Sequence, residues 1–354
     1  MKTAGTLRCG WTTGSAMTAA AIAAWRGAGG PVTLVLPGGE TPEIPVARTW
    51  SGGAAVVKDG GDDPDVTSGC EVAVTVAPFS GEPDGADHAV PCGAGVLVVR
   101  GGSGVGRVTR PGLAVPAGKA AINPGPCRIL AANMERAGFG RVPGERLLVT
   151  VSVPGGEVIA AKTLNPVLGI TGGISILGNS GIVRPFSNAA YAATIALQLR
   201  SAAANGARTA ALTTGNRTTA AVRRDWPEIP PEAVVPIADF IRVAVRAAAS
   251  AGFGRLVIGC MPGKLFKYAC GLENTHAHRS RLTLSRLREF GAELPCVPLE
   301  EFDTMGELAV RIGEERYRAV LDPVYERAFA VLREWAGAME LELALYGDDG
   351  RRIR

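Results

Sequence analysis

The sequence lacks several features that mark particular classes of protein. Its seven cysteines include no C-x-x-C pair, and their odd number and scattered positions argue against a disulfide framework. Its longest apolar run, Ala19–Trp25, is far shorter than the ~20 residues needed to cross a bilayer, and the N-terminus has no signal-peptide core. These absences predict a cytoplasmic protein with no membrane segment.

The chain also carries little net charge. The formal net charge is only +4, which is too small and too dispersed to predict a nucleic-acid partner. Lysine is rare, because six of the 37 basic residues are lysines and 31 are arginines. Arginine suits bidentate recognition of carboxylates and phosphates, although genomic base composition produces the same bias.

Glycine and proline, by contrast, are abundant. The 47 glycines and 24 prolines make up about a fifth of the 354 residues, so many turns are expected. The chain is long enough for two domains with cores of their own. The sequence leaves the oligomeric state open, and a homo-oligomer remains compatible with it.

The segment Lys162–Arg200 is the most distinctive stretch. Its first half sets glycines, among them Gly172 and Gly173, between Ile, Val and Leu, which is typical of short buried strands broken by tight turns. Ser187 then predicts the start of a helix with Tyr191, Ile195 and Leu199 on one face. Glycine-rich backbone before a helix can bind an anion, and a packed hinge between domains is the alternative.

Two further segments of the first half carry polar groups. Thr12, Thr13 and Gly14 precede an alanine-rich helix and would form either an anion cradle or an ordinary helix cap. Lys58–Gly69 holds four aspartates in one glycine-rich loop, but the ligand spacing of an EF-hand is missing. A solvated acidic turn is the simpler interpretation of that loop.

A glycine cluster at Gly101–Gly106 resembles a dinucleotide-binding loop but fails the test of context. The motif should open a helix, whereas the following Arg107–Gly112 is strand-like and interrupted by proline. We therefore expect a bulged hairpin at Gly104 that lines a site.

The second half alternates strands and helices. Strands are expected at Thr209–Thr213, Ala233–Pro236 and Arg255–Gly259, with a helix at Ile237–Ala251, which predicts a parallel sheet. Ligands of such sheets bind beyond the carboxyl ends of the strands. Three loops follow these ends, and they carry Gly215 with Asn216, Asp239, and Lys264. The predicted fold is α+β / α/β, with an N-terminal two-layer α+β domain (1–185), a Rossmann-like parallel-sheet domain (186–310), and a C-terminal helical segment with an edge strand (311–354).

The chain resembles the CbiD family, the cobalt-precorrin-5B C1-methyltransferases of anaerobic cobalamin synthesis. Gly10-Trp11-Thr12-Thr13-Gly14 is similar to the family opening Gly-Tyr-Thr-Thr-Gly, and the loop at Lys58 to the family string Lys-Asp-x-Gly-Asp-Asp-Pro-Asp-Val-Thr. The run from Gly104 and the segment Lys162–Arg200 also resemble family signatures. The resemblance implies transfer of a methyl group from S-adenosylmethionine to C1 of cobalt-precorrin-5B, giving cobalt-precorrin-6A.

The resemblance also gives the site residues their expected roles. Cobalt would arrive inside the tetrapyrrole substrate, so no protein metal ligand is required, and the spacing of Cys260, Cys270, His276 and His278 matches no common zinc pattern. The expected roles are catalysis by His276 or Asp59; cofactor binding, in a cleft between the domains, by Gly172, Gly173, Gly215, Asn216 and Asp239; and substrate binding by Thr12, Thr13, Gly14, Asp62, Asp63, Gly104, Arg107, Arg110, Arg184 and Lys264.

The loops of the second half depart from the family pattern. Ala238-Asp239 stands where the family has Ser-Asn, Cys260 replaces a histidine, and Ala277 with His278 replaces Ser and Asp. Two alternatives to the methyltransferase therefore stay open. One is a small-molecule kinase of the GHMP type, suggested by Thr12–Ser15; the other is a corrinoid-binding paralogue without catalytic activity.

Overall fold

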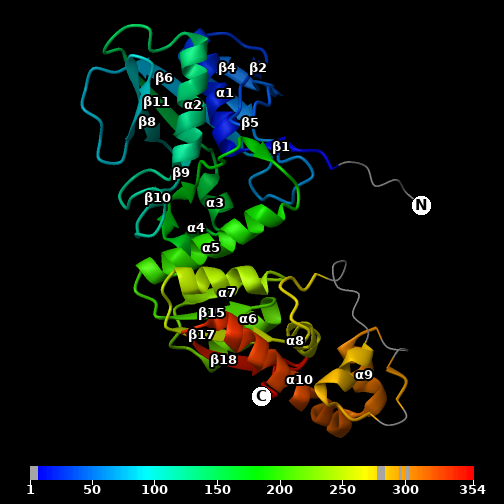
Figure 1. Ribbon diagram of the computed structural model, residues 1–354. Helices are drawn as coiled ribbons and strands as arrows, with labels where there is room; N and C mark the ends of the chain where they lie inside the picture. Colours follow the sequence, from blue (N-terminus) through cyan, green and yellow to red (C-terminus); the bar gives the residue numbers. More distant parts are fainter. Residues whose placement is uncertain (1–6, 277–283, 295–296, 300–302) are drawn as a thin grey trace. The chain divides into compact units, whose positions relative to one another are not determined.

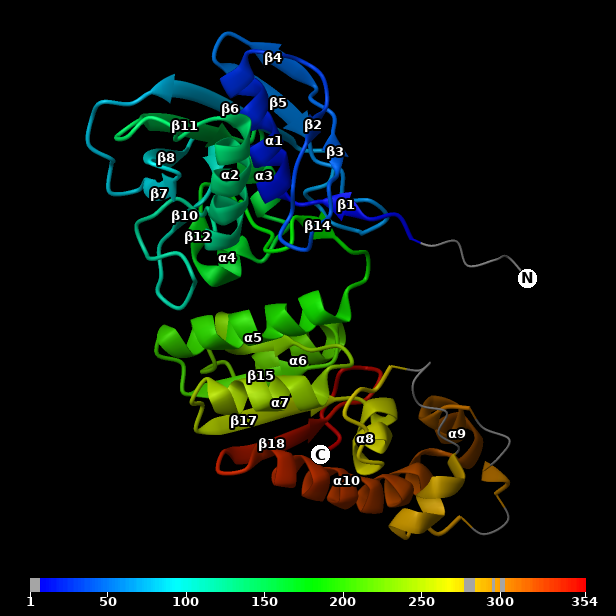
Figure 2. The ribbon, with the colours of Figure 1, turned by 45° about the horizontal axis from the view of Figure 1, so that its top comes forward.

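The computed structural model describes residues 7–276, 284–294, 297–299 and 303–354. The chain forms two compact units, 1–187 and 188–354. Each has its own hydrophobic core, and the two sets of core residues do not overlap. Both units mix helices with sheets, as Figures 1 and 2 show.

The first unit is built on a six-stranded sheet of order β4-β5-β6-β11-β8-β7, in which only β11 and β8 run parallel. Helices α1 and α2 pack against each other, and α1 also contacts β5 and β6 (Figure 1). The bounds of these elements are β4 Arg48–Trp50, β5 Gly53–Val57, β6 Glu71–Pro78, β7 His88–Cys92, β8 Gly95–Gly101, β11 Arg146–Ser152, α1 Thr13–Arg26 and α2 Pro124–Ala137.

Short two-stranded pairings connect the remaining parts of this unit. β1 pairs with β14, β2 with β3, β10 with β12, and β9 runs parallel to β13. Their bounds, with two short helices, are β1 Gly10–Trp11, β2 Val32–Thr33, β3 Glu43–Ile44, β9 Gly104–Val105, β10 Arg107–Val108, α3 Gly156–Ala160, α4 Asn165–Leu168, β12 Ile170–Thr171, β13 Gly173–Ile174 and β14 Ile182–Val183.

The hairpin expected around Gly104 is therefore wrong. β9 and β10 do not pair with each other, but each pairs with a strand of the glycine-rich segment about 65 residues later in the chain. Close backbone contact is the reason that glycine is needed here. A Cβ added at Gly104 would lie 1.8 Å from the Val153 carbonyl oxygen, and one added at Gly173 would lie 2.1 Å from the Gly104 carbonyl oxygen.

The second unit contains a four-stranded sheet of order β16-β15-β17-β18, and all its strands are parallel. The chain passes from β15 through α6 to β16 on one side of β15, and then from β16 through α7 to β17 on the other side of β15. Since crossovers between parallel strands are right-handed, these opposite directions place α6 and α7 on opposite faces of the sheet. The bounds are α5 Asn188–Ala204, β15 Thr209–Thr213, α6 Asn216–Asp225, a 3₁₀ turn Pro231–Ala233, β16 Val234–Pro236, α7 Ile241–Ser250, β17 Arg255–Cys260, α8 Pro262–Ala269, a 3₁₀ helix Leu284–Phe290, α9 Met305–Ile312, α10 Glu314–Ala336 and β18 Glu340–Leu345.

The expected βαβ alternation is present in this unit, with two differences in the helices. Helix α7 begins at Ile241 and not at Ile237, because the chain turns first through Ala238, which has a φ of +46°. The expected C-terminal helical segment begins within one helix, α9, and continues in a second, α10, and the two are divided at Gly313, which has a φ of +79°. Among the described residues, no helix is long and apolar enough to cross a membrane.

Candidate functional site

The carboxyl ends of the parallel strands in the second unit lie at one edge of the sheet. Thr213 at the end of β15 is in register with Pro236 of β16 and with Gly259 of β17. The loops that follow these strands therefore begin side by side. They carry Asn216 and Asp239, and Lys264 follows in the first turn of α8.

The loop after β15 is held by a residue that the sequence did not single out. The Thr218 hydroxyl oxygen accepts hydrogen bonds from the backbone N–H groups of Thr214 (3.0 Å) and Gly215 (3.1 Å). Gly215 and Asn216 are exposed at the start of α6. Together with Arg217 and Met261, these residues line a small pocket of about 270 Å³. Met261 brings the end of β17 into the same pocket.

Asp239 is the centre of a polar network at this edge. Lys264 Nζ and Thr275 Oγ1 both donate to Asp239 Oδ1, the latter at 2.7 Å. Lys264 Nζ also donates to Thr275 Oγ1 at 2.8 Å, and Lys267 Nζ donates to the Thr275 carbonyl at 2.7 Å. Among the described residues, nothing donates to Asp239 Oδ2. One oxygen of this carboxylate is therefore fixed, and the other is available to a ligand.

The charge of Asp239 is stabilised by this arrangement. Burial alone raises the pKa of the carboxyl group, but the hydrogen bonds from Lys264 and Thr275 outweigh burial and hold the pKa below its usual value. Asp239 is therefore an acceptor and not a general acid at neutral pH. The residue before it, Ala238, has a left-handed backbone, and such strain in a residue with a side chain is typical of functional segments.

His276 lies beside this network. The preceding residue, Thr275, is buried, and its backbone N–H donates to the Asp239 carbonyl at 3.0 Å. This bond holds the backbone just before His276 next to Asp239. His276 itself is exposed, and its N–H donates to Asn274 Oδ1 at 3.0 Å. His278 lies outside the described residues. Cys260, at the end of β17, is fully buried, and burial strongly raises the pKa of its thiol.

In the first unit, Thr12, Thr13 and Gly14 are buried and bonded to the glycine-rich segment. The Thr13 hydroxyl accepts from the Leu177 N–H at 2.9 Å, and the Gly14 N–H donates to the Leu177 carbonyl at 3.1 Å. The Thr12 N–H donates to the Gly181 carbonyl at 3.0 Å. These hydrogen bonds hold the two segments together.

The aspartate-rich loop is likewise tied to its own chain. Asp59 pairs with the Arg8 guanidinium, and Asp62 accepts from the Arg8 N–H at 2.6 Å. Asp63 accepts from the Phe186 N–H at 3.0 Å. The hydrogen bond from Arg8 lowers the pKa of Asp59, which makes its carboxylate a weak base.

A buried ion pair anchors the same loop. Lys58 is 2% exposed, and its Nζ lies 2.8 Å from Asp65 Oδ2, while Asp65 Oδ1 accepts from the Thr67 N–H (2.8 Å) and hydroxyl (2.7 Å). Across the described residues, no group of His, Cys, Asp or Glu side chains is arranged to hold a metal ion.

The predicted arginines of the first unit lie on its surface. Arg107 on β10 and Arg110 after it are exposed, and β10 pairs with β12, which leads directly to Gly172. An added Cβ at Gly172 would meet no atom within 4 Å, so its backbone is accessible, whereas Gly173 packs on Gly104. Arg184 is exposed and lies 3.3 Å from Glu40. Sequence reasoning missed four residues at the edge of the second sheet, because a single threonine, methionine or lysine carries no signal of its tertiary contacts. They are Thr218 in α6, Met261 before α8, Lys267 in α8, and Thr275.

Comparisons with known proteins identify the family of the chain. A family model described as CbiD matches residues 1–185. The chain is 41% identical over 352 residues to the cobalt-precorrin-5B C(1)-methyltransferase of Nitratidesulfovibrio vulgaris, covering 94% of this chain and 88% of that one. It is 39% identical to the protein of that name from Salinispora arenicola, covering 98% and 92%. The crystal structure of the cobalamin biosynthesis protein (cbiD) from Archaeoglobus fulgidus is 28% identical, covers 78% of this chain and 84% of its own, and aligns with a TM-score of 0.41. The family model matches more than half of the chain, and the two methyltransferases are 41% and 39% identical to it over nearly its whole length. The chain therefore belongs to the CbiD family.

Proposed function

We propose that this protein is a methyltransferase that transfers a methyl group from S-adenosylmethionine to C1 of cobalt-precorrin-5B, a step of cobalamin biosynthesis. The observation that carries this conclusion is the 41% identity to a cobalt-precorrin-5B C(1)-methyltransferase over 94% of the chain. The alignment covers 94% of the chain and therefore extends across both units.

The chemistry requires two reactants held in line. An electron pair of the macrocycle forms the new bond to the methyl carbon while the carbon–sulfur bond breaks, and the sulfonium leaves as a neutral thioether. Positioning of the reactants contributes most of the rate of such a reaction. The cobalt ion belongs to the substrate in this proposal, and the protein contributes shape, hydrogen bonds and charge.

We assign the cofactor to the carboxyl edge of the second sheet. The strand order β16-β15-β17-β18 is that of a Rossmann-like domain, in which ligands bind where the chain crosses from one face to the other. Asn216 and Gly215 offer exposed groups there, and the open Oδ2 of Asp239 suits a ribose hydroxyl. In the first unit, the backbone of Gly172 is open, whereas Gly173 is packed on Gly104.

The substrate proposal rests on exposed arginines. The acetate and propionate groups of a precorrin are carboxylates, which guanidinium groups bind with two hydrogen bonds. Arg107 and Arg110 are exposed close to Gly172 in the fold of the first unit, and Arg184 is exposed with only a weak surface pair. Lys264 was also expected to bind substrate, but its ammonium group already donates to Asp239 and Thr275. We therefore assign Lys264 a positioning role.

For a proton acceptor, His276 is a better proposal than Asp59. His276 is exposed next to the Asp239 network, whereas Asp59 has a lowered pKa and is held by Arg8. The start of α1 gives little support to a kinase, because the Thr12 hydroxyl caps α1 by accepting from the Ser15 N–H and the Thr13 hydroxyl accepts from the Leu177 N–H.

Anaerobic turnover of cobalt-precorrin-5B with methyl-labelled S-adenosylmethionine, followed by mass spectrometry, tests the function. One labelled methyl group on the macrocycle is expected. Corrinoid binding without methyl transfer would replace the proposal with a non-catalytic binding protein. Binding of neither ligand would overturn the assignment.

A further inference from the structure

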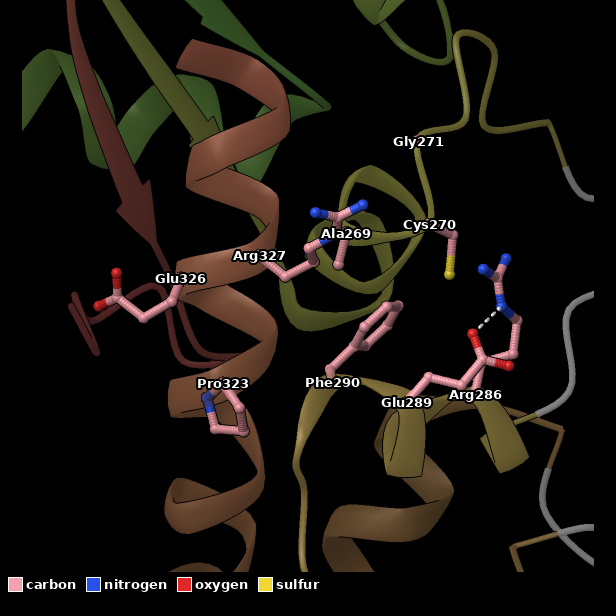
Figure 3. Close-up of a pocket in the computed structure, with 9 residues that line it drawn as sticks. All are labelled: Ala269, Cys270, Gly271, Arg286, Glu289, Phe290, Pro323, Glu326 and Arg327. Carbon is pink, nitrogen blue, oxygen red and sulfur yellow. Dashed lines mark hydrogen bonds and ion pairs between the residues drawn. The ribbon is translucent and has the colours of Figure 1, made fainter. Parts of the chain in front are cut away.

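A second cavity lies in the second unit away from the carboxyl edge of the sheet. It has a volume of about 670 Å³, is open to solvent on one side, and is bounded by three elements: the end of α8, the 3₁₀ helix Leu284–Phe290, and the middle of α10. This volume is in the range of small-molecule sites, about 300–1,000 Å³. Its lining residues are Ala269, Cys270, Gly271, Arg286, Glu289, Phe290, Pro323, Glu326 and Arg327, drawn in Figure 3.

The cavity is separated from the proposed cofactor site by the length of a helix. Helix α8 begins with Pro262 at the carboxyl edge of the sheet, and the cavity contacts its last residue, Ala269. Seven residues of α-helix span about 10 Å. A ligand of this cavity would therefore bind beside α8 at the end opposite Lys264.

One positive charge of the cavity, that of Arg327, is unpaired within the part of the chain that the structure describes. Arg286 is paired with Glu289 at 3.1 Å, and Glu326 is paired with Arg354. Among the described residues, no carboxylate pairs with Arg327. The charge available to a ligand is therefore that of a single guanidinium group, which favours an anion.

An aromatic surface lies beside this charge. The Phe290 ring projects into the middle of the cavity, between Arg327 and Cys270, as Figure 3 shows. It is half-buried and held by an edge contact with Phe266, with the ring centroids 6.2 Å apart. Ala269 and Gly271 supply little side-chain volume, which leaves room next to the ring. A flat apolar body fits such a surface better than a polar one.

We propose that this cavity is a second binding site, for a small molecule that joins a flat apolar body to one anionic group. The flat body lies against Phe290, and the carboxylate, phosphate or sulfonate group binds Arg327. The methyl-transfer proposal uses none of these residues, so an experiment that contradicts one proposal leaves the other unaffected.

Two fluorescent probes test the charge and the flat body independently. Anilinonaphthalene sulfonate is flat and carries one negative charge, and N-phenyl-naphthylamine has the same flat body without the charge. We expect the full-length protein to bind the anionic probe with the higher affinity. Arg327→Gln should weaken the anionic probe about tenfold, as expected for loss of a charge-assisted hydrogen bond, and leave the neutral probe unchanged.

Matched variants control for folding and for general surface charge. Arg316→Gln makes the same change on an exposed arginine of α10 that does not line the cavity, and it should bind both probes like the wild type. Phe290→Leu keeps apolar volume but removes the flat ring, and it should weaken both probes; Phe290→Ala is the stronger version. Equal affinities of the anionic probe for the Arg327 and Arg316 variants would overturn the proposal.

Cys270 gives a second measurement at the site itself. It is a free cysteine that lines the cavity, and Cys9 is a free, exposed cysteine of the first unit. A saturating concentration of the anionic probe should slow alkylation of Cys270, measured by peptide mass spectrometry, and leave alkylation of Cys9 unchanged. Unchanged alkylation of Cys270 under saturation would place the probe elsewhere and overturn the proposal.

Discussion

The two units use aspartate in different ways. In the first unit, the aspartates that follow Lys58 form contacts with Arg8, Lys58, Thr67 and the backbone of Phe186, and these contacts fix the loop. In the second unit, Asp239 receives two hydrogen bonds on one oxygen and none from the described residues on the other. The number of acidic residues in a loop therefore says less about ligand binding than the number of carboxylate oxygens that the fold leaves open.

The largest effect should come from the buried cation of the first unit. Lys58→Met leaves Asp65, whose side chain is 27% exposed, without its ionic partner, which should destabilise the first unit by about 3 kcal/mol. Hydrogen exchange of peptides from β5 and β6 measures this loss, with peptides from β15 as the internal control. An equal loss of protection in both units would contradict a local structural role, and cofactor affinity should not change.

Asp239→Asn tests the open oxygen. Loss of a charged acceptor should weaken binding of S-adenosylhomocysteine by about 2 kcal/mol, or roughly 30-fold, in isothermal titration calorimetry. Asp65→Asn is the matched control in the first unit and should leave the affinity unchanged. If the two variants bind the cofactor product equally well, the comparison between the loops fails.

The pKa of Asp239 should depend on Lys264. Because the pKa is lowered in the folded protein, the carboxylate contributes stability at neutral pH, and that stability is lost as the pH falls below the usual aspartate value of about 4. In Lys264→Met, burial remains while the main hydrogen bond is removed, so the pKa should rise and the loss should occur at higher pH. Carbon NMR of the Asp239 carboxyl group gives both midpoints, and an unshifted midpoint would contradict the assigned cause.

Backbone strain next to Asp239 predicts a smaller effect. Ala238 has a φ of +46°, where glycine is favoured, so Ala238→Gly should stabilise the second unit by up to about 1 kcal/mol. Ala247→Gly, inside helix α7, should destabilise it by about as much. Thermal unfolding followed by circular dichroism compares the two variants. Destabilisation by both substitutions would show that Ala238 carries no relievable strain.

The smallest effect is expected at Arg8. Its side chain is 59% exposed, and solvent screens its pair with Asp59. Arg8→Ala should be indistinguishable from the wild type in thermal unfolding, and methyl transfer should be unchanged. A loss of turnover with an unchanged melting temperature would instead give Asp59 a role in the reaction and would reverse the comparison between the loops.

Much of the second unit could be predicted from its sequence. Its strands are short apolar runs followed by glycine or polar loops, and parallel strands bring their carboxyl ends to one edge, which is why Asn216, Asp239 and Lys264 were expected near each other. The contact between Lys264 and Asp239 was not predicted. A lysine at a helix start has the same local pattern whether it binds an external anion or a carboxylate of its own chain.

The first unit shows the limit more clearly. The hydroxyl groups before α1 have the local pattern of an anion cradle, but Thr13 bonds to Leu177, which is 164 positions away. The glycines at 104 and 173 were expected to serve turns or ligands, and they also allow two distant backbones to touch. Neither contact leaves a signal in neighbouring residues.

The sequence by itself determined the family, the mixed α/β character and the places where strands and helices form, because apolar periodicity, glycine and capping residues act over a few neighbouring positions. Only the tertiary structure decided which polar groups are free for chemistry. A hydrogen bond from the distant Leu177 uses the Thr13 hydroxyl, and bonds from Lys264 and Thr275 leave one oxygen of Asp239 open. Such pairing depends on how the whole chain packs.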